Sequence, residues 1–172
     1  AAMDTVVMVV GAAGALLTTL VAGLFLSLWL KARRTRLYVA PEESTNSIVI
    51  ISGCDSGFGR ETTLKLLARG FHVIATTFTE EGPRQLAFDA QSLPGELTTC
   101  NVDITKDDSV DELLAVVENI LDLNLEKSVV GLVNNAGIAL LGPIEVQSLG
   151  NFIKQHEVNL FGHIRMIQAL LP

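Results

Sequence analysis

The stretch ISGCDSGFGR, residues 51–60, places three glycines at the spacing G-x-x-x-G-x-G between an apolar run and a helical pattern. The run SIVIIS at 47–52 is typical of a strand that is buried on both faces. Gly53 allows a tight turn, Gly57 lets a phosphate approach the backbone, and Gly59 lets the next helix pack closely. The N–H groups that begin this helix attract an anion. The stretch therefore predicts a strand-to-helix turn that binds a pyrophosphate.

The same alternation of strand and helix continues along the chain. Strands are predicted at 47–52, 71–77, 96–104 and 128–134. Helices are predicted at 57–69, 80–93 and 148–171. A further helix is predicted to begin after a Thr105 cap, with Asp108 three residues on in a capping-box-like arrangement. Such alternation indicates a parallel sheet with helices on both faces. We therefore predict an α/β fold, a Rossmann-type doubly wound parallel sheet with strand order 3-2-1-4.

The segment before this region has a different character. Residues 6–30 contain no charged side chain, and at about 1.5 Å per residue they can span a hydrocarbon core of roughly 30 Å. A buried core helix and a cleaved signal peptide are the alternatives, but the run is too long for a signal peptide. Lys31 and three arginines follow it, which places the remainder of the chain in the cytoplasm. The predicted organisation is a membrane anchor with a basic flank at 1–36, a linker at 37–46 and the α/β region at 47–172.

Charge and cysteine content exclude several classes of function. The net charge is −7, and the basic residues beyond 31–36 are scattered, so nucleic acid is not an expected partner. The two cysteines, Cys54 and Cys100, form no disulfide framework, and we interpret them as small buried apolar groups. His156 and His163 share a helix face, but no third ligand is evident and no metal site is predicted.

Four motifs carry a resemblance to a known family. SGCDSGFG, NVDIT, LVNNAG and HEVNLFGHIRM occur in this order from residue 52 to 166. The region from about 47 to 172 resembles the N-terminal half of a short-chain dehydrogenase/reductase. The sequence GCDSGFG is most similar to that of the branch that contains retinol, hydroxysteroid and 3-hydroxybutyrate dehydrogenases. The resemblance implies an NAD(P)-dependent oxidoreductase that interconverts a lipophilic alcohol, of retinoid or steroid kind, and its carbonyl.

The resemblance also implies roles for individual residues. The residues implied to line the phosphates and adenosine ribose of the cofactor are Gly53, Ser56, Gly57, Phe58 and Gly59, and Asp55 of the same loop is implied to be cofactor-binding. Asp103 and Ile104 would meet the adenine ring. Asn135, Ala136 and Gly137 would flank the ribose and brace the sheet. Asn159 matches a catalytic helix asparagine whose local kink holds a water in the proton relay, whereas the residue by itself favours an exposed or capping amide, because asparagine is an indifferent helix former.

Two positions depart from the family pattern. Ser52 stands where threonine is usual and keeps the hydroxyl. The end of the second strand has Thr76, Thr77 and Phe78, where an NAD site usually has an acidic residue that binds the ribose 2′-hydroxyl. That turn has no arginine for a 2′-phosphate, and Glu80 and Glu81 would repel one. We therefore expect NAD(H) to be favoured over NADP(H).

The family's proton-transfer residues do not occur in these 172 residues. The family uses a serine and a Tyr-x-x-x-Lys pair, but the single tyrosine, Tyr38, lies in the linker without such a lysine. We expect this chain to be inactive alone and to be a fragment of a membrane-anchored oxidoreductase. The expected location is a single-pass protein of the endoplasmic reticulum with its domain in the cytoplasm, or a mitochondrial membrane. The alternatives are a non-catalytic, membrane-tethered dinucleotide-binding or interaction module, and a relative that binds nothing. The last helix could pair two copies into a homodimer.

Overall fold

The computed structural model describes residues 44–171 of the chain. The predicted membrane helix at 6–30 and the linker up to residue 43 lie outside the described residues. None of the helices within 44–171 combines the length and the apolar character that crossing a bilayer requires.

Four parallel strands form a single sheet in the order β3-β2-β1-β4. The strands are β1 (Ser47–Ile51), β2 (His72–Thr77), β3 (Glu96–Asn101) and β4 (Ser128–Val133). In β1, Ile48 pairs with His72 of β2 and with Val129 of β4, so β1 lies in the interior of the sheet. All residues of β1 and β2 are buried, whereas β3 and β4 are partly exposed. The predicted Rossmann-type sheet and strand order are confirmed, and the order places the β1 and β4 ends side by side.

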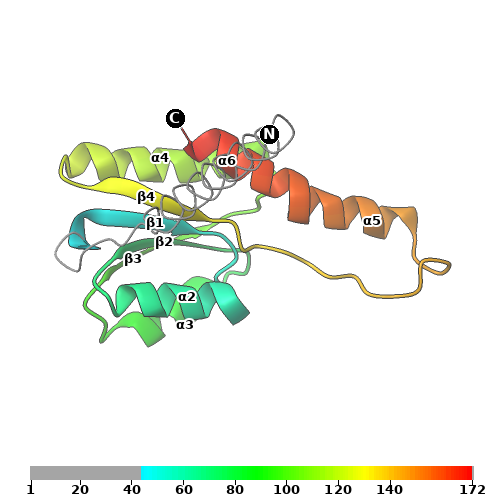
Figure 1. Cartoon of the computed structure of the whole chain (residues 1–172), viewed down its shortest axis with the longest axis horizontal. Helices are drawn as coiled ribbons and strands as arrows, with labels where there is room; N and C mark the ends of the chain where they lie inside the picture. The colour runs from blue at the N-terminus through cyan, green and yellow to red at the C-terminus, as the bar shows by residue number, and fades with distance from the viewer. Residues whose placement is uncertain (1–43, 172) are drawn as a thin grey trace, which may run out of the picture. The chain divides into compact units, whose positions relative to one another are not determined.

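Helices cover both faces of the sheet (Figure 1). On one face lie α2 (Gly57–Leu67) and α3 (Gly82–Ala90), and on the other lie α4 (Asp107–Leu123) and α6 (His163–Leu170), while α5 (Leu149–His156) extends beyond the sheet in Figure 1. Side chains alternate along β1, as the strand period of two requires. Val49 and Ile51 pack with Leu67 of α2 on one face, while Ile48 and Ile50 pack with residues of α4 and α6 on the other. The sheet therefore lies between two apolar layers.

The predicted Thr105 cap is wrong by one residue. The N-cap of α4 is Lys106, and its side chain makes no capping hydrogen bond in the described chain. The N–H and hydroxyl of Thr105 instead donate to Asp103 Oδ1, at 3.0 and 2.7 Å. This local turn stabilises the loop after β3 and moves the start of α4 to Asp107.

The predicted last helix is present, but it is interrupted. Ser148 caps α5 by accepting the Asn151 N–H at 3.2 Å. A π-helical turn, η2 (Glu157–Gly162), then joins α5 to α6. A Cβ at Gly162 would lie 2.7 Å from Ile104. Glycine therefore lets this helix pack directly on the loop that follows β3.

Candidate functional site

The loops after β1 and β4 are joined by hydrogen bonds at the carboxyl edge of the sheet. The buried Ser52 Oγ accepts the N–H groups of Asn135 and Ala136, both at 3.0 Å. The Asn135 amide donates to the carbonyls of Ser52 at 3.0 Å and Gly53 at 2.8 Å. Residues about 80 positions apart in the chain therefore form one rigid joint.

The three positions of the first motif are occupied by glycine for different geometric reasons. A Cβ at Gly53 would lie 2.6 Å from Ala136 Cα, and one at Gly59 would lie 2.3 Å from the Gly53 carbonyl oxygen. Neighbouring backbone atoms therefore leave no room for a side chain at Gly53 or Gly59. Gly57 has a φ of +59°, and apart from its chain neighbours and the backbone of its own helix no described atom lies within 4 Å of where its Cβ would be. Gly57 therefore presents bare backbone to open space at the start of α2.

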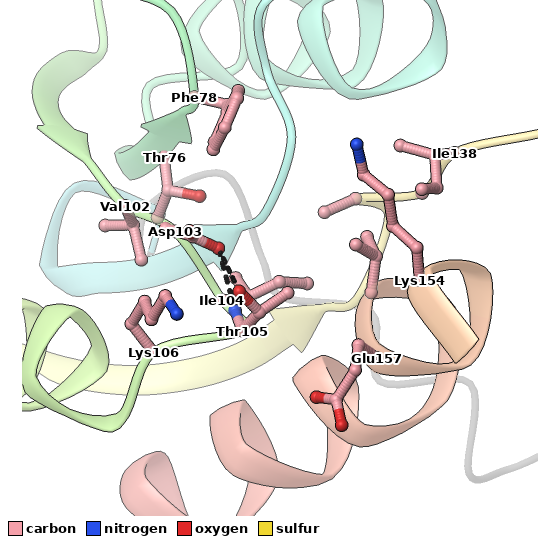
Figure 2. Close-up of a pocket in the computed structure, with 13 residues that line it drawn as sticks. Thr76, Phe78, Val102, Asp103, Ile104, Thr105, Lys106, Ile138, Lys154 and Glu157 are labelled. Carbon is pink, nitrogen blue, oxygen red and sulfur yellow. Dashed lines mark hydrogen bonds between the residues drawn. The ribbon is translucent and has the colours of Figure 1, made fainter. Parts of the chain in front are cut away.

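A cavity of about 490 Å³ opens at the same edge of the sheet. Its wall consists of Thr76 near the end of β2 and Phe78 just after it, residues 102–106 after β3, residues 136–138 after β4, Lys154 of α5, and Glu157 and Val158 of η2. Figure 2 shows Phe78 and Asp103 on one side of this cavity and Ile138 and Lys154 on the other. Strand ends that are distant in sequence thus surround one space.

Asp103 and Ile104 contribute to this wall in different ways. The Asp103 carboxylate accepts two hydrogen bonds from Thr105, while its backbone N–H donates to Ser109 Oγ at 3.0 Å. Ile104 is almost fully buried and packs in the core layer below. The carboxylate is therefore held by its own turn, and the isoleucine supplies an apolar floor.

Asn159 lies in the π-helical turn and binds the loop after β4. Its Oδ1 accepts the Ile138 N–H and its Nδ2 donates to the Ile138 carbonyl, both at 2.8 Å. A Cβ at Gly137 would lie 3.4 Å from Asn159 Oδ1. The amide thus fixes Ile138 in the wall of the cavity, so it is not a capping amide of its own helix.

Asp55 reaches from the glycine loop to the turn after β2. It accepts hydrogen bonds from the N–H groups of Phe78 and Thr79 and from the Thr79 hydroxyl. Partial burial alone would raise the pKa of Asp55, but the hydrogen bonds from Thr79 and Phe78 outweigh it and lower the pKa below its ordinary value. The carboxylate is therefore charged at neutral pH.

Cys54, in the same loop, is not poised for chemistry. Its side chain is buried, and burial raises the pKa of the thiol to about 11, against the opposing effect of a hydrogen bond from Thr63. A thiol with this pKa stays protonated at neutral pH and is a poor nucleophile.

The comparisons with known proteins identify the family. A family model described as short chain dehydrogenase matches residues 47–172. The chain belongs to the short-chain dehydrogenase family. This is a family of NAD(P)-dependent oxidoreductases.

Among the curated relatives, retinol dehydrogenase 5 of Homo sapiens is 39% identical over 84% of this chain and 42% of its own length. The mitochondrial D-beta-hydroxybutyrate dehydrogenase of Bos taurus is 34% identical over 80% of this chain and 40% of its own length. The chain thus spans about two fifths of the length of these relatives.

Solved structures of the family share the fold. An alcohol dehydrogenase from Thermococcus sibiricus, complexed with 5-hydroxy-NADP, superposes with a TM-score of 0.64 and 25% identity, covering 73% of this chain and 52% of that one. A hydroxysteroid dehydrogenase from Escherichia coli superposes with a TM-score of 0.66 and 22% identity, covering 77% of this chain and 54% of that one, and supports the fold alone.

Most residues that the sequence singled out gather at this edge, in three groups. Asp103, Ile104, Ala136 and Gly137 line the cavity; Gly53, Asp55, Gly59, Asn135 and Asn159 hold its loops together; and Ser56, Gly57 and Phe58 are exposed at the start of α2. Phe58 is 87% exposed and does not belong to the cavity wall. Sequence reasoning did not single out Ile138, Lys154 or Glu157: Glu157 lies within the motif HEVNLFGHIRM, whereas Ile138 and Lys154 lie in none of the four motifs. The hydroxyl that Ser52 shares with the family's usual threonine was the signal for its role as a joint.

The residues at this edge fit the nicotinamide dinucleotide that short-chain dehydrogenases use. Gly57 leaves room for a phosphate beside the N–H groups that begin α2. Among residues 44–171, buried Asn134 Oδ1 at the end of β4 is one of two buried side-chain atoms without a hydrogen-bond partner. Asn134 does not line the cavity, so the fit rests on Gly57 and the start of α2.

Proposed function

We propose that this chain binds NAD(H), in preference to NADP(H), within an oxidoreductase that interconverts a lipophilic alcohol and its carbonyl compound. The dinucleotide supplies or accepts the hydride when it is bound. Residues 47–172 would hold and orient it. The reaction itself is proposed for the whole protein, since proton transfer in this family needs a tyrosine and a lysine that these 172 residues do not supply.

One observation carries the proposal: there is free space next to the backbone of Gly57, at the start of α2. Beside it, hydrogen bonds among Ser52, Gly53 and Asn135 hold the ends of β1 and β4 together. In an open parallel sheet, ligands bind at the carboxyl ends of strands where the strand order reverses. The order β3-β2-β1-β4 reverses between β1 and β4. The pyrophosphate would lie on Gly57, with Gly53, Ser56, Phe58 and Gly59 shaping its loop.

The remaining residues of the edge would take the other parts of the dinucleotide. Asp103 and Ile104 would bound the adenine, because both line the cavity beside the end of β2. Ala136 and Gly137 would flank the ribose on the opposite wall. Asn159 would keep its proposed place in a proton relay, in addition to its hydrogen bonds to Ile138.

The substrate class and the location are also proposals. The relatives include a retinol dehydrogenase and a mitochondrial D-beta-hydroxybutyrate dehydrogenase, and retinoid- or steroid-like alcohols partition into bilayers. The uncharged segment at 6–30 with its basic flank would anchor the protein in a membrane. We propose the endoplasmic reticulum with the domain in the cytoplasm, and a mitochondrial membrane as the alternative.

A homodimer through the last helices is proposed as well. The apolar side chains that support it are exposed to between 40 and 46%: Leu160, Phe161, Ile164 and Ile167. They follow one another along η2 and α6, so a second copy could cover them with its own equivalent face.

The experiment is a fluorescence titration of the full chain with NADH, comparing wild type with Gly57→Ala and Gly70→Ala. Gly70 has a φ of +85° and follows α2, so its replacement strains the backbone as at Gly57 but away from the site. Each variant should lose about 1–2 kcal/mol of stability, measured by urea unfolding. We expect only Gly57→Ala to weaken NADH binding, by tenfold or more (about 1.4 kcal/mol), because its methyl group fills the phosphate space.

Two results would contradict the proposal. Wild-type chain that does not bind NADH would rule out the dinucleotide site. Equal NADH affinity in wild type and Gly57→Ala would place the phosphate elsewhere.

A further inference from the structure

A carboxylate stands at the end of β2 although the local sequence has none there. Strand β2 ends at Thr77, and the chain continues through Phe78 and Thr79. Asp55, from the loop after β1, places Oδ2 2.9 Å from the Phe78 nitrogen and Oδ1 2.9 Å from the Thr79 nitrogen. The Thr79 hydroxyl donates to the same Oδ1 at 2.6 Å. The first strand's loop therefore provides the acidic group that the second strand lacks.

The surroundings hold this carboxylate in one orientation. Three donors from two consecutive residues bind it, and a Cβ at Gly82, the first residue of α3, would lie 2.8 Å from Asp55 Oδ1. A carboxylate offers about four acceptor positions, and the three hydrogen bonds leave one of them on Oδ2. Asp55 is only partly buried. The remaining position can therefore accept a hydrogen bond from a ligand.

The carboxylate adjoins the proposed cofactor site on two sides. Asp55 lies between Gly53 and Gly57 of the phosphate loop, and its partner Phe78 lines the cavity together with Thr76 and Asp103. A dinucleotide with its pyrophosphate at Gly57 and its adenine beside Asp103 would bring its adenosine ribose to this turn. In dinucleotide-binding folds an acidic group at the end of the second strand binds the ribose 2′-hydroxyl.

We propose that Asp55 selects the cofactor, accepting the 2′-hydroxyl of the adenosine ribose of NAD(H) and repelling the 2′-phosphate of NADP(H). This inference rests on the proposed function, and it gives a named residue to the preference for NAD(H). Glu80 and Glu81, to which the sequence pointed, are weaker candidates. Both are exposed, and Glu81 lies 3.9 Å from Arg84, so solvent and a counter-charge screen them.

The test compares dissociation constants of NADH and NADPH, measured by fluorescence titration of the full chain in mild detergent. The variants are Asp55→Asn and, as a second uncharged replacement, Asp55→Ser. Glu80→Gln is the matched control because it removes an equal charge from the same turn without touching the Asp55 hydrogen bonds. Thr79→Val removes one of those hydrogen bonds and keeps the charge.

We expect wild type to bind NADH more tightly than NADPH. Either Asp55 variant should narrow the ratio of NADH to NADPH affinity at least about tenfold. Near a protein surface, the repulsion between the Asp55 carboxylate and a 2′-phosphate about 4 Å away exceeds the free energy that corresponds to a tenfold change in affinity. Glu80→Gln and Thr79→Val should change the ratio less than about threefold, since both retain the Asp55 carboxylate.

The contrary outcomes separate the two proposals. If wild type binds neither dinucleotide, the proposed function fails and this inference fails with it. If wild type binds NADH but the Asp55 variants weaken NADH and NADPH equally, Asp55 only shapes the turn and the inference alone is overturned. If Glu80→Gln narrows the ratio of NADH to NADPH affinity as much as the Asp55 variants do, the preference for NADH comes from the summed negative charge of the turn and not from Asp55.

Discussion

Ser52 illustrates how much of the site depends on a single hydroxyl. Its side chain is fully buried, and its Oγ accepts the N–H groups of Asn135 and Ala136. Replacement by alanine leaves two donors of the joint without a partner. We expect Ser52→Ala to lower the free energy of unfolding by about 2–4 kcal/mol, measured by urea unfolding followed by circular dichroism.

Ser52→Thr is the matched control for this substitution. Threonine keeps the hydroxyl and adds one methyl group, so we expect a loss of about 1 kcal/mol, the low end of what an added methyl group costs in a packed core. An alanine variant as stable as wild type would contradict the role of the hydroxyl as the joint between the β1 and β4 loops.

At the scale of elements, a polar cluster ties β2, β3 and the start of β4 together at the edge opposite the cavity. His72 is 1% exposed, and its Nε2 lies 2.9 Å from Thr98 Oγ1. Its Nδ1 lies 3.0 Å from Lys127 Nζ, and Lys127 also pairs with Glu96. A lysine donor at Nδ1 requires a neutral imidazole that donates from Nε2.

This cluster predicts a loss of stability in mild acid. Burial lowers the pKa of His72, Lys127 lowers it further, and Glu96 opposes both. The unfolded chain therefore binds the proton more readily than the folded chain, so the free energy of unfolding falls as pH drops below about 6.5, the ordinary histidine value. The pKa of Glu96 is also lowered, first by its hydrogen bond to Lys127. Its contribution is lost only below the ordinary glutamate value of about 4.3.

The measurement is urea unfolding between pH 5 and pH 7.5, with His72→Gln as the comparison. We expect the wild-type curve to slope downward toward pH 5 more steeply than the variant, because Glu96 stays ionised in this window. Identical slopes would show that His72 protonates as easily in the folded state as in the unfolded one.

At the scale of the whole molecule, the proposed anchor predicts how the protein partitions. We expect the full chain to stay in the membrane pellet after alkaline carbonate extraction. The double substitution Leu16→Arg, Val21→Arg should move it to the supernatant, because each arginine near the centre of a membrane helix costs about 2.5–3.5 kcal/mol. Leu37→Arg, just beyond the basic flank, is the control and should leave the protein in the pellet. Release of the wild-type chain by carbonate would contradict a spanning anchor.

The sequence by itself determined the local and periodic features of this protein. Runs such as 47–52 and 71–77 are apolar throughout because these strands are buried on both faces, and that burial leaves a readable pattern. The glycine spacing predicted the turn after β1, and the NNAG motif marked the end of β4. The strand order followed from the alternation and from the handedness of parallel crossovers.

The tertiary structure decided which distant side chains meet. The sequence has no acidic residue directly at the end of β2, where the family usually has one, yet the Asp55 carboxylate reaches this turn from more than 20 residues away. Asn159 bonds Ile138, and Thr105 folds back on Asp103 so that α4 begins later than its capping pattern predicted. Periodicity records which face of an element is buried. Hydrogen bonds between loops depend on how the β1, β2 and β4 ends are placed side by side, and that placement exists only once the sheet has formed.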